Sequence, residues 1–352
     1  MKKWNILNTY PENGDILSTL LKNRNITDPA DIEEFLHPLT LQEYKTQLSE
    51  EFKQGLVSAS ELILTYIKNN HPIIIYGDYD CDGVCATAIL YKTLTDRLRH
   101  SNCTYFIPNR FEHGYGVSTK ALDELHVTRA KDVPCLLITV DTGITAVEEV
   151  EYAKQLGFDV IVTDHHQKAQ TLPKANVVLW TDTVVGSGVS WLLSTFLGLD
   201  DYLYIDLCAL ATVTDLQPLI GINRAIVIHG LAKLNSETKY GIKSLLDLAG
   251  KAGSIGVYEL GWIIGPRINA LGRMEHAIRG VELLVTDDPT RALELASVLQ
   301  STNVIRQDET EKMYDLANVS DTSGNIIISA DSNYHEGIIG LVAARLVQKF
   351  FK

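Results

Sequence analysis

Three aspartates at alternate positions, directly after an apolar run, are the groups in this chain best placed to do chemistry. Residues 72–75 have the pattern of a buried strand, and Asp78, Asp80 and Asp82 follow within a few positions. Three carboxylates so close together repel one another unless a cation lies among them. The pattern therefore predicts half of a metal site at the end of the strand.

Further carboxylate and imidazole groups follow other apolar runs that could also be strands. In an open parallel α/β sheet, ligands bind outside the carboxyl ends of the strands, so side chains at these ends converge. The groups are Asp141 after residues 135–140, Asp164, His165 and His166 after 158–163, and Asp215 after 210–214.

The residue types in these clusters indicate the metal and the reaction. Oxygen and imidazole ligands without thiolate suit Mn²⁺ or Mg²⁺ and are compatible with Zn²⁺. The ligands are too many for one catalytic ion with open positions. Two ions about 3.5–4 Å apart fit better, and such pairs stabilise the attacking and leaving oxygens of phosphoryl transfer.

Each cluster also has a structural explanation. A single aspartate after a strand is usually a turn former or a helix N-cap. Asp82 and Gly83 are compatible with an ordinary turn, and His165 and His166 with surface or core histidines. The occurrence of all four clusters at the ends of apolar runs favours one shared metal site.

The composition is that of a soluble globular protein, with 352 residues, 45% of them hydrophobic and 21% charged. This length suffices for one large or two ordinary domains. No apolar run reaches the roughly 18–20 residues of a membrane span, and the start lacks a signal-peptide core. We expect a cytoplasmic protein without a membrane partner. Its five cysteines are odd in number and dispersed, which favours buried, reduced thiols.

The net charge of −13 argues against a protein coated with basic charge for nucleic acid. It does not exclude a nuclease, because metal ions supply positive charge at the site itself. Arg267, Arg273 and Arg279 form the best local basic cluster. Residues 265–273 are expected to lie between two helices, where guanidinium groups match phosphate oxygens, although a helix-capping loop with solvated arginines would also explain them. Residues 186–190 could hold a phosphate at a helix N-terminus or form a plain glycine-rich connection.

The pattern of apolar residues predicts an α/β fold with a doubly wound, mainly parallel sheet. Expected strands are 72–76, 103–107, 135–140, 158–163 and 176–180, joined by helices near 84–99, 117–126, 144–156 and 188–198. Residues 203–265 are mostly helical in pattern, a long helix covers 289–317, and a strand at 326–330 precedes a helix at 337–351. The expected regions are a helical N-terminal lead-in (1–70), a catalytic domain (71–285), a connecting helix (286–322) and an incomplete second α/β lobe (323–352).

Several segments together resemble the DHH phosphoesterase superfamily, and more narrowly its RecJ-type single-strand-specific DNA exonucleases. The likeness runs over nearly the whole chain in the family's order. The matching segments are residues 77–83, 107–116, 140–144, 162–166, 215–219, 265–270 and 335–340.

The resemblance implies a role for each matching residue. The expected ligands of two Mn²⁺ or Mg²⁺ ions are Asp80, Asp82, Asp141, His165, His166 and Asp215, with Asp78 and Asp164 orienting them. The residues expected to contact DNA phosphates are Arg267, Asn269, Arg273, His335 and Arg345. The implied activity is 5′-to-3′ removal of mononucleotides from single-stranded DNA in recombination and repair, with a single-strand-binding protein and a helicase as further candidate partners.

Two alternatives stay open beside this reading. The chain ends at Lys352 before a second lobe could be complete, so we expect either a fragment or a shortened relative. A shortened lobe would suit a small-substrate phosphodiesterase acting on oligonucleotides or cyclic dinucleotides. A catalytically idle fragment or scaffold is the third possibility, although such a protein would typically lose ligands.

Overall fold

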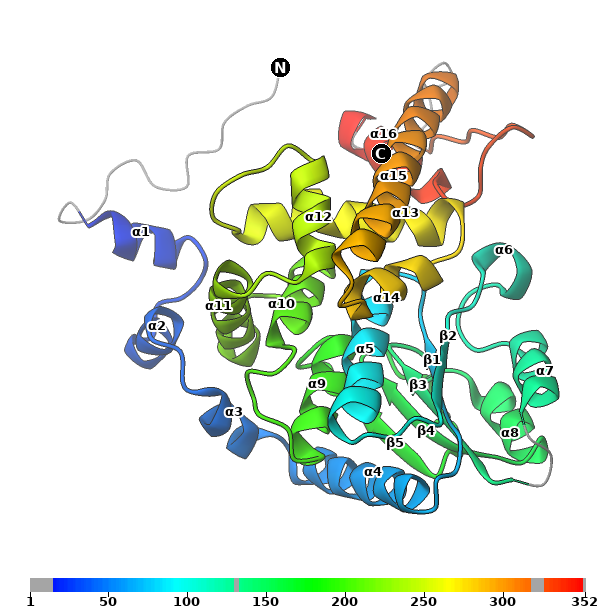
Figure 1. Cartoon of the computed structure of the whole chain (residues 1–352). Helices are drawn as coiled ribbons and strands as arrows, with labels where there is room; N and C mark the ends of the chain where they lie inside the picture. Colours follow the sequence, from blue (N-terminus) through cyan, green and yellow to red (C-terminus); the bar gives the residue numbers. More distant parts are fainter. Residues whose placement is uncertain (1–14, 130–132, 318–325, 351–352) are drawn as a thin grey trace.

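The computed structural model describes residues 15–129, 133–317 and 326–350, and its centre is a five-stranded parallel sheet (Figure 1). The strand order is β2-β1-β3-β4-β5, and every neighbouring pair is parallel. The five predicted strands are confirmed as β1 (Ile73–Gly77), β2 (Cys103–Phe106), β3 (Cys135–Val140), β4 (Phe158–Asp164) and β5 (Val177–Trp180).

Helices cover both faces of the sheet, which confirms the doubly wound arrangement (Figure 1). Side chains along a strand alternate between faces, so Ile73 and Ile75 join one apolar cluster while Ile74 and Tyr76 join the other. The first cluster lies against α4 (Glu50–Lys68), α5 (Cys81–Lys92) and α9 (Gly186–Phe196), and the second against α7 (Thr119–Thr128) and α8 (Val147–Gln155).

The strand order places a topological switch point between β1 and β3. The chain passes from β1 outward to β2 and then returns to β3 on the other side of β1. The two crossovers therefore leave a crevice at the carboxyl ends of β1 and β3, where open α/β sheets bind ligands. The loops after these strands carry Asp78 and Asp141, so the fold brings the predicted site residues to this crevice.

The predicted helical lead-in is confirmed from residue 15 onward by three short helices before α4, and residues 1–14 of that region lie outside the described residues. Asp28 caps α2 by accepting a hydrogen bond from the Ala30 amide, and Pro29 occupies the first helical position. Thr40 and Glu43 form a reciprocal capping box at the start of α3. These helices are α1 (Ile16–Lys22), α2 (Pro29–Leu36) and α3 (Leu41–Gln47).

The region after the sheet is helical, and two predictions here were wrong. Residues 210–214 belong to a buried helix, as the mostly helical pattern of 203–265 predicts, and not to the strand that their apolar run also suggested, because a short apolar run does not distinguish the two. Residues 265–273 lie within a helix and not between two helices. The helices are α10 (Ile205–Thr214), α11 (Gly221–Ser236), α12 (Tyr240–Leu248), the π-helical turn η3 (Glu259–Ile264), α13 (Gly265–Met274) and α14 (Ile278–Val285).

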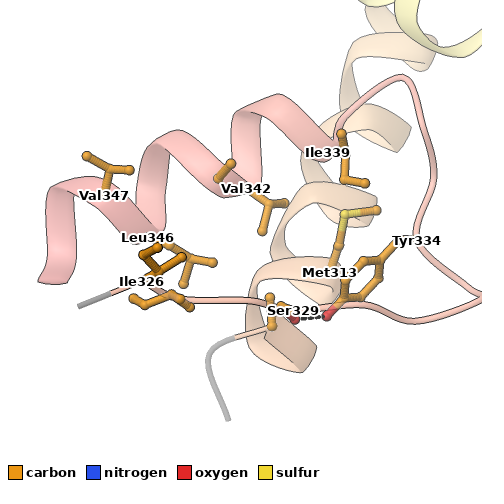
Figure 2. Close-up of a pocket in the computed structure, with 11 residues that line it drawn as sticks. Met313, Ile326, Ser329, Tyr334, Ile339, Val342, Leu346 and Val347 are labelled. Atoms are coloured by element: carbon orange, nitrogen blue, oxygen red, sulfur yellow. Dashed lines mark hydrogen bonds between the residues drawn. The ribbon is translucent and has the colours of Figure 1, made fainter. Parts of the chain in front are cut away.

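The long helix α15 (Pro289–Ala317) has the predicted bounds, whereas the strand predicted at 326–330 does not form. A strand needs a hydrogen-bonding neighbour, and no described segment pairs with these residues. Ile326 instead lies beside α15 and α16 (Ile339–Phe350), at an apolar cavity of about 270 Å³ that Met313 and Val342 also line (Figure 2). The predicted end of α16 at residue 351 falls outside the described residues. So does the predicted boundary at 322–323 between the connecting helix and the second lobe. The predicted domain boundaries stay predictions.

All five cysteines are buried and unpaired, as predicted: Cys81, Cys85, Cys103, Cys135 and Cys208. Burial raises the pKa of the Cys103 thiol to about 12 and that of Cys135 to about 11. Within the part of the chain that the structure describes, no helix combines the length and apolar character needed to cross a membrane.

Candidate metal centre

Asp82 is held rigidly by backbone amides from a distant helix. It lies in the first turn of α5, and its Oδ2 accepts a hydrogen bond from the Gly186 amide at 2.6 Å while Oδ1 accepts one from Ser187 at 2.8 Å. The two amides belong to the N-terminus of α9, where helix geometry favours a negative charge. They are therefore occupied by a carboxylate and are not available to a phosphate.

Asp80 and Asp78 are fixed by local hydrogen bonds. Asp80 is the N-cap of α5, and its Oδ1 accepts from the amides of Asp82 at 2.9 Å and Gly83 at 3.0 Å. Asp78 Oδ1 accepts from the Tyr79 amide at 2.8 Å. The capping role and a ligand role are compatible for Asp80, because capping uses only one of its two oxygens.

Asp141 is the carboxylate that most needs a partner. It is 1% exposed, and neither of its oxygens accepts a hydrogen bond from any described residue, although His165 Nε2 lies 3.1 Å from Oδ1. Its backbone is left-handed, with φ +61°, which few residues other than glycine adopt. A buried, unsatisfied carboxylate costs free energy unless a cation or a proton compensates it. This donor set fits a divalent cation.

His165 lies close to Asp141 and also to two other carboxylates of the site. Its Nε2 lies 3.5 Å from Asp82 Oδ2 and 3.9 Å from Asp215 Oδ2. Asp215 is the C-cap of α10, so a helix end, not a strand end, brings it to the cluster. Three groups offer ligand atoms that all lie within 4.8 Å of one another: Asp141, His165 and His166; Asp82, His165 and Asp215; and Asp78, Asp80 and Asp141.

Asp164 orients the neighbouring histidines. Its Oδ1 accepts from the backbone amides of His165 at 2.7 Å and His166 at 3.1 Å, and it lies 2.7 Å from His166 Nδ1. Its Oδ2 accepts from the Ile144 amide at 2.9 Å. A histidine held at Nδ1 by a carboxylate presents Nε2, which is the arrangement that supports metal-ligating histidines.

The electrostatics of the site favour a cation. Burial, with the charge of Asp80 next, raises the pKa of Asp78 to about 8, and burial with Asp82 next raises that of Asp215 to about 7. The same two causes, burial first and then the charge of Asp82, raise the pKa of Asp80 and Asp141. Crowded carboxylates with raised pKa values release their protons readily when a divalent ion neutralises their charge.

The pKa values of the histidine–carboxylate pair move in opposite directions. The hydrogen bond to Asp164 raises the pKa of His166 to about 9. Burial alone would raise the pKa of Asp164, but its hydrogen bonds with His166 and the Ile144 amide lower it below the usual value. The two side chains therefore form an ion pair when no metal is bound. A metal ion that binds His166 must displace a proton from its imidazole.

Comparison with known proteins identifies the family. The model of the DHH family, N-terminal domain, matches residues 72–212. The single-stranded-DNA-specific exonuclease RecJ of Bacillus subtilis is 34% identical and aligns with 96% of this chain and 44% of its own length. A crystal structure of exonuclease RecJ bound to manganese matches with a TM-score of 0.78 at 33% identity, covering 90% of this chain and 80% of that one.

RecJ of Thermus thermophilus, solved in complex with Mn²⁺, matches with the same TM-score of 0.78 at 30% identity, over 94% of this chain and 48% of that one. The chain belongs to the DHH family, on its RecJ branch. It spans about half the length of the curated RecJ relatives that it matches.

The structure of this RecJ-branch chain places only some of the predicted phosphate-contacting residues beside the metal centre. Asn269 Oδ1 accepts from the Cys81 amide at 2.7 Å, so it joins α13 to the start of α5. Arg273 Nη1 donates to the Gly337 carbonyl at 3.2 Å, and His335 Nδ1 accepts from the Gly337 amide at 3.1 Å. These contacts bring the segment at 335–337 to the end of α13.

The two remaining residues of that set are engaged elsewhere. Arg267 donates to Gln300 Oε1 at 2.7 Å and to the Ile263 carbonyl at 2.6 Å. Arg345 pairs with Glu311 Oε2 at 2.7 Å, on α15, and shares no contact with the carboxylate cluster among the described residues. Its phosphate-binding role stays a prediction without geometric support.

Two arginines that were not predicted as site residues also lie near the candidate metal centre. Arg110, on the short helix α6 (Arg110–His113), donates to the Gly272 carbonyl at 3.1 Å and lies 4.4 Å from the Tyr79 ring centroid. Burial lowers the pKa of Arg273 and the charge of Arg110 adds to that shift, and the same charge partly opposes the rise in the pKa of Asp78. Arg110 falls within the matching segment 107–116, which carried a signal. Arg306, close to Arg273, lies within the long helix α15, where nothing in the sequence distinguished it.

Proposed function

We propose that this chain is a metal-dependent exonuclease that hydrolyses phosphodiester bonds of single-stranded DNA with two Mn²⁺ or Mg²⁺ ions. The observation that carries the proposal is the buried carboxylate of Asp141, which accepts no hydrogen bond from any described residue and lies among carboxylates and imidazoles from four separate stretches of chain. Relatives named as single-stranded-DNA-specific exonucleases, including a structure bound to manganese, support the substrate and the metal.

The ligands proposed for the two ions are those expected from the sequence: Asp80, Asp82, Asp141, His165, His166 and Asp215. Asp141 is shared between the group that contains His166 and the group that contains Asp80, which supports a bridging role. When bound, such ions polarise the scissile phosphate and lower the pKa of a water molecule for in-line attack. Asp78 and Asp164 hold neighbouring groups in position through the contacts described above.

The arginines beside the centre are proposed to hold the substrate. Arg110 and Arg273 are already fixed by carbonyl oxygens of Gly272 and Gly337, and each guanidinium has further donors for phosphate oxygens. Prior fixing lowers the entropy lost when a substrate binds. The 5′-to-3′ direction, the roles in recombination and repair, the protein partners and the cytoplasmic location stay predictions.

The deciding experiment is digestion of 5′- or 3′-labelled single-stranded DNA by the purified chain, with Mn²⁺ or with a chelator. We expect Mn²⁺-dependent release of mononucleotides from one labelled end, and its loss in Asp141→Asn. Faster hydrolysis of a dinucleotide than of a long strand would instead favour the small-substrate phosphodiesterase. Mn²⁺ binding without any hydrolysis would favour the idle scaffold and overturn the proposal.

A further inference from the structure

Two aromatic side chains lie exposed on the helical turn that precedes α13. Trp262 is 72% exposed and Tyr258 is 58% exposed. Their rings are nearly parallel, with 25° between the planes and 6.5 Å between the centroids. The Lys251 ammonium lies 5.6 Å from the centroid of the Tyr258 ring. Exposed aromatic rings of this size are typical of binding surfaces, because burying them on a ligand yields a large gain.

The exposed face of α13 connects this aromatic pair to the metal centre. Helical residues three, four and seven positions apart lie on one face. Within α13 this pattern links Pro266, Asn269 and Arg273, which are all partly exposed, whereas Ile268 is buried. Trp262 lies four positions before Pro266, in the π-helical turn η3. The burial pattern therefore agrees with a continuous accessible stripe along η3 and α13.

The stripe ends at the site itself. Asn269 contacts the Cys81 amide, and Cys81 lies between the candidate ligands Asp80 and Asp82. Trp262 lies in the π-helical turn η3 and Asn269 lies seven positions further along, in α13. At the α-helical rise of about 1.5 Å per residue, seven positions span about 10 Å. That distance corresponds to about three nucleotides of a stacked strand, which rises about 3.4 Å per nucleotide.

We propose that Trp262 and Tyr258 form a stacking platform for bases of single-stranded DNA, within about three nucleotides of the phosphate at the metal centre. This inference rests on the proposed function. Stacking suits the substrate, because every base has an aromatic face and binding needs no sequence preference. It also suits the chain, whose net charge of −13 gives little long-range attraction for DNA. Lys251 would supply positive charge beside the platform.

The test measures DNA binding apart from hydrolysis. Binding of a fluorescently labelled oligodeoxythymidylate, longer than ~16 nucleotides to exceed common site sizes, is followed by anisotropy in a chelating buffer. Trp262→Ala should weaken binding by about five-fold or more, the loss typical of one stacked base, and Trp262→Phe should retain most of the affinity. Tyr202→Ala is the matched control, since Tyr202 is also exposed (48%) but contacts His229 elsewhere on the surface.

Kinetics with Mn²⁺ give a second readout. Trp262→Ala should raise KM for the long strand with kcat little changed, and it should leave hydrolysis of a dinucleotide as in the wild type. Binding that is lost in Trp262→Ala while the wild type hydrolyses nothing would uphold the platform and reject the nuclease. Wild-type-like DNA binding by Trp262→Ala overturns the inference.

Discussion

The Gly186 amide and the Asp82 carboxylate lie 2.6 Å apart, although 104 residues separate them in the sequence. This contact joins the N-terminus of α9 to the first turn of α5. It places a fixed partial positive charge against one candidate ligand and also brings the α9 backbone against Asp141. A Cβ atom added at Gly186 would lie 2.4 Å from Asp141 Cβ. The glycine is therefore required by close approach, not by an unusual backbone angle.

Gly186→Ala should lower both stability and metal affinity. The added methyl group must displace Asp141 or α9, and overpacking of this kind costs about 1–3 kcal/mol in the free energy of unfolding. We expect a lower melting temperature and at least a tenfold weaker Mn²⁺ affinity by calorimetry. Gly340→Ala, at a position in α16 with nothing within 4 Å of an added Cβ, should be neutral or mildly stabilising. Equal effects of the two substitutions would contradict the close-packing argument.

Asp141→Asn should remove the stabilisation that Mn²⁺ gives without destabilising the metal-free protein. Its oxygens have no hydrogen-bond donors to lose among the described residues, and its crowded surroundings disfavour the charge. We expect a melting temperature in chelator equal to or above that of the wild type, with little increase on adding Mn²⁺. Asp247→Asn, exposed on α12, should keep the wild-type response. A large loss of stability in chelator would show that Asp141 has a structural partner.

The metal-free protein should lose stability as the pH rises from about 5 to about 8. The raised pKa values of Asp215, about 7, and Asp78, about 8, mean that the folded state binds more protons than the unfolded state in this range. Stability then falls with pH, and the raised pKa of His166, about 9, acts in the same direction above about pH 6.5. The lowered pKa of Asp164 acts oppositely below about pH 4, and the pKa values of His100 and His276, which burial lowers, act oppositely up to about pH 6.5. Above about pH 6.5 only the raised pKa values contribute.

Metal should reverse this trend, because ion binding requires the deprotonated ligands and strengthens as the pH rises. The measurement is a set of calorimetric melts across the range, with chelator and with Mn²⁺. A melting temperature in chelator that is flat or rises with pH would count against the crowded, protonated carboxylates.

Asn269→Ala should destabilise the protein through α5. The side-chain Oδ1 of Asn269 accepts a hydrogen bond from the Cys81 amide, one of the amides at the start of α5 that the helix itself leaves unpaired. Loss of such a cap costs about 0.5–2 kcal/mol, measurable as a shift of the urea midpoint with an unchanged slope. Asn69→Ala removes only an exposed hydrogen bond to Thr65 and serves as control. If both variants unfold at the wild-type midpoint, the contact between α13 and α5 contributes nothing to stability.

The sheet and the acids around it could be predicted because the signals are local. Buried parallel strands form continuous apolar runs, and the structure places β3 at 135–140, as expected. Asp78, Asp141 and Asp164 follow such runs, so the parallel topology alone brings them to one edge. Asp215 reached the site for a different reason, since the apolar run before it is a buried helix.

The remaining features depend on contacts between distant residues or on missing neighbours. Asp82 accepts hydrogen bonds from the amides of α9, a contact between two segments that each had a local explanation. Asp82 was compatible with an ordinary turn, and residues 186–190 with a glycine-rich connection. The convergence of Arg110 and Arg273 likewise follows from the packing of α6 against α13, seen in the Arg110–Gly272 contact. Residues 326–330 have a strand-like composition, but strand formation is a property of a pair, and no described segment supplies the second member.

Because every thiol is buried, chemical labelling of the cysteines can report local opening of the fold. Cys135 lies on the central strand β3, Cys103 on the outer strand β2, and Cys208 within α10. A thiolate must attack the disulfide reagent, and these thiols have raised pKa values and are 5% exposed or less. The labelling rate of each cysteine therefore measures a different local opening. Labelling of Cys103 reports release of the sheet edge, and labelling of Cys135 reports opening of the middle of the sheet.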